Sequence, residues 1–166
     1  MRTKAEFVNP FVEAGIKVIK ELSGVTFRRG HLTFRRNTSP SYDVSIVLGV
    51  YGYLSGQVVY SMGQDVAERL VCKMLGDLNE SQVEALFGDT LGELANMITG
   101  AATAILNDRD DLALMVTTPA IIRGNAMNVS FVTSPTIVLG LYSQWGPIEI
   151  NIALAPNGNR PVNPVR

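Results

Sequence analysis

Apolar residues recur at helical spacing from residue 82 to residue 106, in the longest regular pattern of the chain. If each residue advances about 100° around a helix axis, seven of these side chains fall within an arc of about 100° and form a predicted buried stripe. They are Val83, Phe87, Leu91, Leu94, Ile98, Ala102 and Ile105. Asp89, Glu93, Asn96 and Gly100 gather within about 60° on roughly the opposite side. The pattern predicts a long helix that buries one face and turns an acid and an amide away from the core.

Two shorter helices are predicted before this one, at residues 9–23 and 65–76. Asn9 precedes a proline and has the features of an N-cap, with the proline in the first turn, where its missing N–H is not needed. Asp65 stands three residues before a glutamate, and Asn79 stands three residues before a glutamine at the start of the long helix. Both spacings are those of a capping box, so each marks a predicted helix start.

Strands are predicted from β-branched and aromatic runs bounded by turn residues. They lie at residues 25–36, 43–52, 56–61, 112–118, 128–133, 136–142 and 148–154. The order of elements lacks the strict alternation of a doubly wound sheet. We expect an α+β fold, in which one domain over residues 1–155 packs a mostly antiparallel sheet with one N-terminal and two central helices. The tail, residues 156–166, contains three prolines and is expected to fray.

Composition narrows the possible functions. The chain has 166 residues, 14 basic and 15 acidic side chains and a net charge of −1, so it lacks the electrostatic footprint of a nucleic-acid-binding protein. Its apolar runs fall short of the roughly 20 residues that a membrane span needs. We expect a soluble, cytoplasmic protein. Its one cysteine, Cys72, excludes an internal disulfide and is expected to be buried in the second helix.

Polar residues opposite an apolar stripe ordinarily form a solvated helix surface. Here, however, Glu93 is the one ionisable residue between Asp89 and Asp108, whereas solvated helix faces usually carry paired charges. Gly92 and Gly100, in the middle of the helix, each cost about 1 kcal/mol relative to alanine. The side chains flanking the polar residues are also small, namely Ala85, Gly92, Thr99, Thr103 and Ala104. These features favour a docking surface that another backbone approaches closely.

Other candidate chemistry is weak. His31 is the only histidine, which excludes a multi-histidine zinc site and leaves a Ser-His-Asp triad poorly supported. The acids at residues 108–111 lack the spacing of an EF-hand loop. The glycines of the long helix lack the spacing of a phosphate-binding loop. Any chemistry of this chain is therefore expected from Glu93 and Asn96, with no metal and no cofactor bound by the chain itself.

Asp89, Glu93 and Asn96 follow one another with three and then two residues between them, and Pro119 comes after twenty-two more. This signature resembles that of the CheC/CheX/FliY chemotaxis phosphatases. The first helix carries Glu13 but has isoleucine three residues on, where a second copy of the motif would need asparagine. The single copy is most similar to the CheX branch.

The resemblance implies that the chain dephosphorylates the aspartyl phosphate of a CheY-like response regulator. Asn96 would orient the attacking water and Glu93 would pair with a lysine of the receiver domain. Asp89, Gly92 and Gly100 would lie at the partner contact. The Mg²⁺ that the reaction needs is expected in the receiver, not in this chain. The resemblance also implies a homodimer formed through the sheet.

Two other classes of function stay open from sequence alone. The first is a non-catalytic binding module, comparable to the related flagellar-switch domains. The second is a small-molecule enzyme, for which the chain offers neither a nucleophile and base pair nor a set of metal ligands. Release of phosphate from a phosphorylated receiver separates the phosphatase from both.

Overall fold

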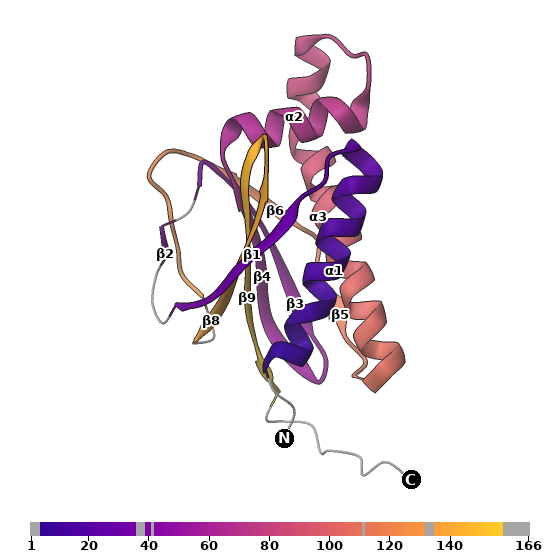
Figure 1. Cartoon of the computed structure of the whole chain (residues 1–166), viewed down its shortest axis with the longest axis vertical. Coiled ribbons are helices and arrows are strands. Elements are labelled where there is room, and N and C mark those ends of the chain that lie inside the picture. Colours follow the sequence, from indigo (N-terminus) through magenta and orange to yellow (C-terminus); the bar gives the residue numbers. More distant parts are fainter. Residues whose placement is uncertain (1–3, 36–38, 41, 111, 132–134, 158–166) are drawn as a thin grey trace.

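An antiparallel sheet backs two long helices in the computed structural model, which describes residues 4–35, 39–40, 42–110, 112–131 and 135–157 (Figure 1). The helices are α1 (Lys4–Ser23), α2 (Gln64–Leu75) and α3 (Glu80–Asp110). The strands are β1 (Arg28–Arg35), β2 (Ser39–Pro40), β3 (Val44–Tyr51), β4 (Leu54–Met62), β5 (Met115–Val116), β6 (Ala120–Arg123), β7 (Asn128–Val129), β8 (Thr136–Ser143) and β9 (Gly146–Pro156).

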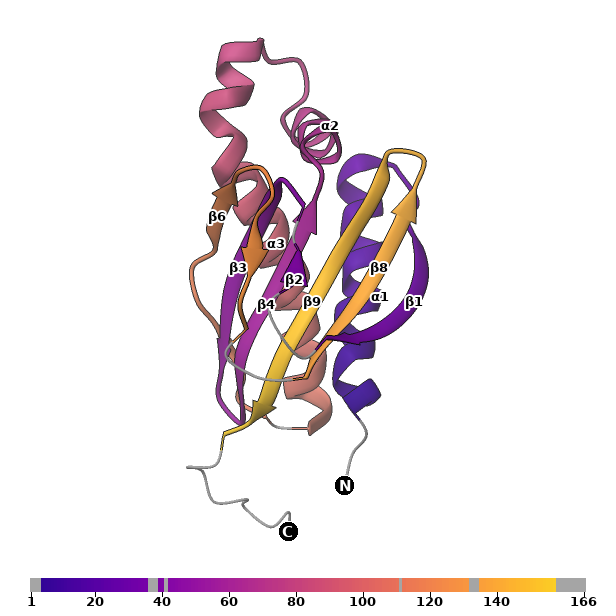
Figure 2. The same ribbon diagram turned by 90° about the vertical axis from the view of Figure 1, so that its left-hand side faces the viewer.

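The main sheet has the strand order β1-β8-β9-β4-β3, and both β5 and β6 pair with β3 at its far edge. These pairings are antiparallel. α1 and α3 lie side by side on one face of the sheet, and α2 crosses near one end (Figures 1 and 2). β2 and β7 form a separate pair on the other side of the sheet. The predicted α+β class and its antiparallel sheet are confirmed.

The first helix does not start at its predicted cap. α1 begins before Asn9, so Pro10 lies inside the helix and has no N–H to donate to the carbonyl of Glu6. The guanidinium of Arg109, near the end of α3, donates to that carbonyl at 3.1 Å. The side-chain oxygen of Asn9 accepts from Arg29 at 3.3 Å instead of capping a helix. The prediction failed because another element supplies the hydrogen bond that the proline removes.

The start of α2 also differs from its prediction. Gly63 is the N-cap and makes no side-chain capping bond, while Asp65 lies in the first turn. The carboxylate of Asp43, immediately before β3, accepts from the backbone N–H of Gln64 at 3.3 Å. A side chain that is distant in sequence thus takes the place of the predicted local cap.

The long helix begins as predicted. The Asn79 side chain accepts from the Gln82 N–H at 3.0 Å, and the Gln82 side chain accepts from the Asn79 N–H at 3.1 Å. This reciprocal pair is the predicted capping box. α3 continues to Asp110, beyond the predicted end at residue 106.

The buried face of α3 is wider than the predicted stripe. Five of the seven predicted positions are buried, namely Phe87, Leu91, Leu94, Ile98 and Ala102, and Val83 is partly buried. Ile105 is wrong, because it is 41 % exposed and Leu106 takes the buried position. Thr99 and Thr103 are also buried, although they were expected to flank the exposed face. The buried arc is wide because α1, the sheet and β6 each cover part of the helix.

Strand boundaries changed mainly after α3. The predicted strand at 112–118 shrinks to β5, and the unpredicted β6 follows Pro119 and pairs with β3. β6 escaped prediction because it is short and its side chains are mostly exposed, without alternation. The predicted strand at 128–133 keeps only β7, and residues 132 and 133 lie outside the described part of the chain.

The last strand also ends later than predicted. β9 includes Pro156, and the N–H of Asn157 donates to the carbonyl of Tyr53 at 2.8 Å. The rest of the predicted tail, residues 158–166, lies outside the described residues. Cys72 is exposed, contrary to the expected burial. Within the described chain, each helix is too short or too polar to cross a bilayer.

Candidate functional site

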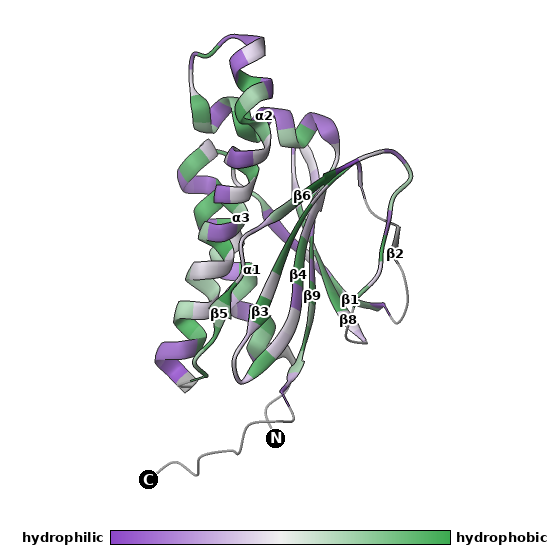
Figure 3. Ribbon diagram, turned by 180° about the vertical axis from the view of Figure 1, so that it is seen from behind, coloured by the Kyte–Doolittle hydropathy of each residue, from purple (hydrophilic) through white to green (hydrophobic). Residues whose placement is uncertain are grey.

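One side of α3 carries the motif residues. Asp89, Glu93 and Asn96 are exposed and Gly100 is half-buried. Spacings of four, three and four residues place them along the same side of a helix. Figure 3 colours the ribbon by hydropathy, and hydrophilic and hydrophobic segments alternate along α3 as this arrangement requires. Asp89, Glu93, Asn96 and Gly100 therefore form one row along α3, which we call the ridge. The predicted acid and amide lie one turn apart on it.

The polar side chains of this ridge are not engaged within the molecule. In the described residues, the side chains of Asp89, Glu93 and Asn96 have no hydrogen bond or ion pair. An acid and an amide on a helix surface are ordinarily solvated in the free protein. Both remain available to pair with groups that another molecule supplies.

Gly92 occupies a different environment from the one expected. It is buried, and a Cβ atom there would lie 3.1 Å from Cγ of Pro119 and 3.4 Å from Cδ1 of Ile121. The space left by the missing side chain is filled by the segment that leads into β6. Gly92 and Pro119, which are distant in the sequence motif, are therefore neighbours in the fold.

Gly100 is the open glycine of the motif. A Cβ atom built on it would meet nothing within 4 Å. Its position four residues after Asn96 leaves bare helix backbone beside the amide. The clearance that the sequence predicted for both glycines is thus found at Gly100 and is filled at Gly92.

Two exposed apolar side chains flank the acid, and the sequence analysis missed them. Leu86 and Met97 are each 39 % exposed. Leu86 stands two turns before Glu93 and Met97 one turn after it, so all three lie on the same side of α3. Their spacing from Glu93 is visible in the sequence, but helical periodicity separates only an apolar stripe from a polar side and does not predict apolar residues on the polar side.

β6 braces the first half of α3. The guanidinium of Arg123 lies 4.2 Å from the centroid of the Phe87 ring and 2.7 Å from a carboxylate oxygen of Glu84. A cation over an aromatic face adds attraction beyond packing. Together with the contact between Pro119 and Gly92, this contact joins β6 to the helix on both sides of Asp89.

The ridge differs from a small-molecule active site. A surface pocket of about 470 Å³ lies between the start of β1 and the β8–β9 turn, and no residue of α3 lines it. Among the described residues, no three histidine, cysteine, aspartate or glutamate side chains gather as metal ligands. The exposed acid and amide are suited to completing a site on the surface of another molecule.

Comparisons with known proteins agree with this arrangement. The family model "Chemotaxis phosphatase CheX" matches residues 44–140, a range that includes the whole motif and Pro119. CheY-P phosphatase CheX of Thermotoga maritima is 22% identical over 125 residues, which cover 75% of this chain and 80% of that protein. The family model matches residues 44–140, and it identifies the family more firmly than a relative that is 22% identical.

Two solved structures have the same fold. Chemotaxis protein CheX from Desulfovibrio desulfuricans is 27% identical, with a TM-score of 0.81 over 92% of this chain and 99% of that one. A chain of the CheX-CheY-BeF3-Mg²⁺ complex from Borrelia burgdorferi is 23% identical, with a TM-score of 0.76 over 89% of this chain and 97% of that one. The second likeness concerns the fold alone.

We predict opposite effects for alanine at the two motif glycines. Gly100→Ala should stabilise the fold by about 1 kcal/mol, because it adds helix propensity in open space. Gly92→Ala should destabilise the fold by about 1 kcal/mol or more, because its Cβ displaces Pro119. Urea unfolding followed by circular dichroism measures both. Equal effects of the two variants would show that Gly92 is not packed as described.

Proposed function

We propose, because the chain belongs to the CheX family of chemotaxis phosphatases, that it removes the phosphoryl group from the aspartate of a CheY-like receiver domain. The carrying observation is the exposed pair of Glu93 and Asn96 on α3, which has no partner among the described residues. The curated relative from Thermotoga maritima is a CheY-P phosphatase, and that activity is extended here to this chain.

The chemical step needs little from this chain. An aspartyl phosphate is an activated acyl phosphate, so a water molecule that attacks phosphorus in line can displace the aspartate carboxylate. The new P–O bond comes from water, the bond between phosphorus and the aspartate oxygen breaks, and the carboxylate keeps the electron pair. Both water protons leave with the phosphate as H₂PO₄⁻. Positioning and charge stabilisation dominate the catalysis of such a step.

Asn96 is the residue that we assign to orienting the water. A carboxamide both donates and accepts hydrogen bonds, so it can hold a water by its proton and by its oxygen. A carboxamide also carries no charge to repel the anionic phosphoryl group. Its exposure on the ridge lets it enter the site of the partner.

Glu93 is assigned to pairing with the lysine of the receiver. It stands one turn before Asn96, so an ion pair there would fix the height of the amide above the phosphoryl group. Asp89 extends the same acidic side, and Gly100 leaves room for the approaching backbone of the receiver. Gly92 acts indirectly, because its missing side chain leaves the space in which Pro119 packs against the helix.

The exposed apolar pair is assigned to docking of the receiver. Leu86 and Met97 lie on the same side as Glu93, and burying them against the receiver would supply binding energy that two polar contacts lack. Methionine adapts its shape to a partner surface. The receiver is the partner assigned to this apolar pair. A receiver domain whose active site takes in Glu93 and Asn96 must also cover the neighbouring Leu86 and Met97.

Mg²⁺ is assigned to the receiver domain. The solved complex from Borrelia burgdorferi contains CheX, CheY, BeF₃ and Mg²⁺ together. In this chain, the described residues offer no cluster of metal-binding side chains. The metal ion would neutralise charge on the phosphoryl group, while Asn96 orients the water and Glu93 pairs with the lysine. A cytoplasmic location follows from such a substrate.

We predict that Asn96→Ala lowers the rate of phosphate release at saturating protein by about 100-fold, because the attacking water loses its alignment. Glu93→Gln should raise KM by about tenfold and leave kcat within a few-fold, because it removes one ion pair. Release of phosphate from a phosphorylated receiver, with and without each variant, measures both effects.

Asn96→Asp is the matched control, because it keeps the shape of the side chain and replaces the donor with a charge. It should be as impaired as Asn96→Ala. Wild-type turnover by Asn96→Ala would refute the role of the amide. Tight binding by the wild-type protein without acceleration of phosphate release would identify a binding module instead.

We predict that Leu86→Gln and Met97→Gln each raise KM about fivefold, the equivalent of about 1 kcal/mol of lost apolar contact. kcat should not change, since neither side chain reaches the phosphoryl group. Ile105→Gln is the control, because Ile105 is 41 % exposed on another side of the same helix. The docking role would be lost if Ile105→Gln weakened binding as much as the other two variants.

We also predict a homodimer, with β1 as the contacting strand. β1 lies at the edge of the main sheet, and Phe34 on it and Tyr142 on the adjacent β8 are exposed. Light scattering should give twice the monomer mass of 18.0 kDa. Phe34→Glu should shift the protein to monomer, and a monomeric wild-type protein would contradict the prediction.

A further inference from the structure

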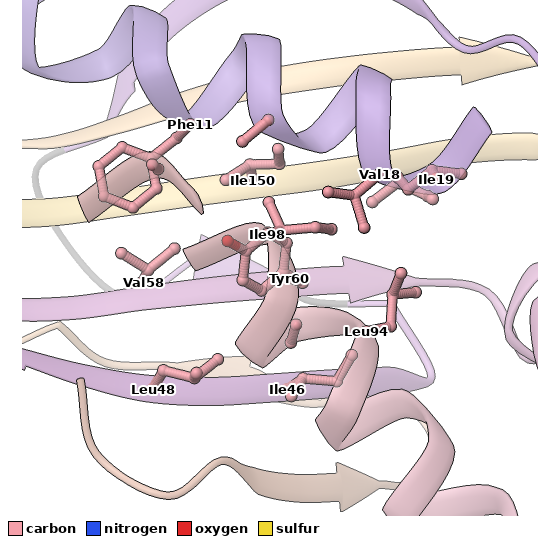
Figure 4. Packing of buried hydrophobic residues seen from close by; sticks show 14 of the residues in the cluster. Phe11, Val18, Ile19, Ile46, Leu48, Val58, Tyr60, Leu94, Ile98 and Ile150 are labelled. Carbon is pink, nitrogen blue, oxygen red and sulfur yellow. The ribbon is translucent and has the colours of Figure 1, made fainter. Parts of the chain in front are cut away.

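Among the described residues, one buried hydrogen bond joins the sheet to the part of α3 that carries the motif. The hydroxyl of Tyr60, on β4, lies 2.8 Å from the hydroxyl of Thr99, on α3. Tyr60 is 2 % exposed and Thr99 is fully buried. Figure 4 shows the Tyr60 ring among apolar side chains that include Leu94 and Ile98 of the same helix. A buried tyrosine hydroxyl needs a hydrogen-bond partner, and Thr99 supplies it from the helix.

The direction of this hydrogen bond can be assigned. The Thr99 hydroxyl donates its only proton to the carbonyl of Ala95, at 2.8 Å. It therefore accepts from Tyr60, which must be the donor. Burial raises the pKa of the Tyr60 hydroxyl well above its usual range. The phenol keeps its proton throughout the physiological pH range. The Tyr60 hydroxyl therefore donates to the Thr99 hydroxyl, which in turn donates to the carbonyl of Ala95.

This pair of hydrogen bonds ends at residues adjacent in sequence to Asn96. Thr99 stands three residues after Asn96, and Ala95 immediately precedes it. The other described hydrogen bonds between α3 and its neighbours lie nearer its ends, where Glu84 pairs with Arg123, Asn107 bonds to Leu114 and Arg109 bonds to Glu6. Tyr60 thus makes the described cross-element bond that is nearest to Asn96 in sequence.

A small void lies beside the Tyr60 ring. A cavity of about 10 Å³, at the lower limit for one water molecule, is lined by residues that include Tyr60, Leu94, Ala95 and Ile98. Apolar contacts have no directional preference, so side chains beside a void can shift by rotamer changes. A hydrogen bond restricts both distance and angle.

We propose that Tyr60 is a positioning residue for Glu93 and Asn96, whose donor bond to Thr99 fixes the height and rotation of α3 on the sheet. The proposal rests on the proposed function for its effect on turnover. Tyr60 does not touch the substrate, since its hydroxyl lies on the buried side of the helix. Asn96 has to hold its water in line, and a displacement of about 1 Å is enough to reduce turnover by about 100-fold.

The test is Tyr60→Phe, which removes the hydroxyl and keeps the ring. We expect kcat for phosphate release to fall about tenfold, with KM within about twofold of wild type, because the outer surface of the helix is unchanged. We also expect faster hydrogen exchange of the backbone amides at residues 93–99. Thr99→Val should give the same pattern, and Thr99→Ser, which keeps the hydroxyl, should stay close to wild type.

Thr103→Val is the matched control. Thr103 is buried on the same helix and donates to the carbonyls of Thr99 and Gly100, but its described hydrogen bonds stay within α3. It should therefore leave kcat and the exchange of residues 93–99 unchanged. An equal fall in kcat for Thr103→Val and Thr99→Val would overturn the proposal, because any lost threonine hydroxyl would then be sufficient.

Hydrogen exchange separates this proposal from the proposed function. If Tyr60→Phe leaves exchange at residues 93–99 unchanged, the positioning role is wrong, whatever the activity. If wild-type protein does not accelerate phosphate release but the exchange pattern is as expected, the function fails and the constraint on α3 stands. Should Tyr60→Phe fail to fold, the contrast between Thr99→Val and Thr99→Ser decides the question.

Discussion

The burial of α3 on several sides is the constraint on which the rest of the structure depends. α1, the sheet and β6 each cover part of the helix, and the side that carries Glu93 and Asn96 remains exposed. Gly92 admits Pro119 to the helix surface, and Arg123 covers Phe87 farther along. These contacts place Glu93 and Asn96 on the exposed side of the helix. Its exposed side is determined by what the other sides bury.

This constraint explains how a chain with so little chemistry of its own can act as a catalyst. The proposed reaction takes its electrophile, metal ion and lysine from the receiver, and needs only an aligned water from this chain. A rigid element can hold a water molecule in alignment, and such positioning can remove a large part of the activation barrier. In the proposed mechanism, the core of the protein would contribute to the reaction through the precision with which it holds one helix, and the exposed apolar side chains would contribute to the choice of partner.

The sequence predicted the features that follow from local pattern. Helical periodicity identified α3 and the shared side of Glu93 and Asn96, and the capping box at Asn79 gave its start. Predictions failed where distant residues supply the partner. Arg109 permits Pro10 inside α1, and Asp43 caps α2 in place of Asp65. The packing of Gly92 under Pro119 and the bond from Tyr60 to Thr99 also join segments far apart in the chain, so no local pattern encodes them.

The most direct test of the shared active site is a structure of this protein bound to a receiver domain that carries Mg²⁺ and beryllofluoride in place of the phosphoryl group. The predicted result has α3 across the receiver site, with the Asn96 amide one water molecule away from the analogue and the Glu93 carboxylate on the receiver lysine. Leu86 and Met97 should be covered by the same contact. A complex in which the receiver binds another surface and leaves Asn96 in solvent would contradict the shared site.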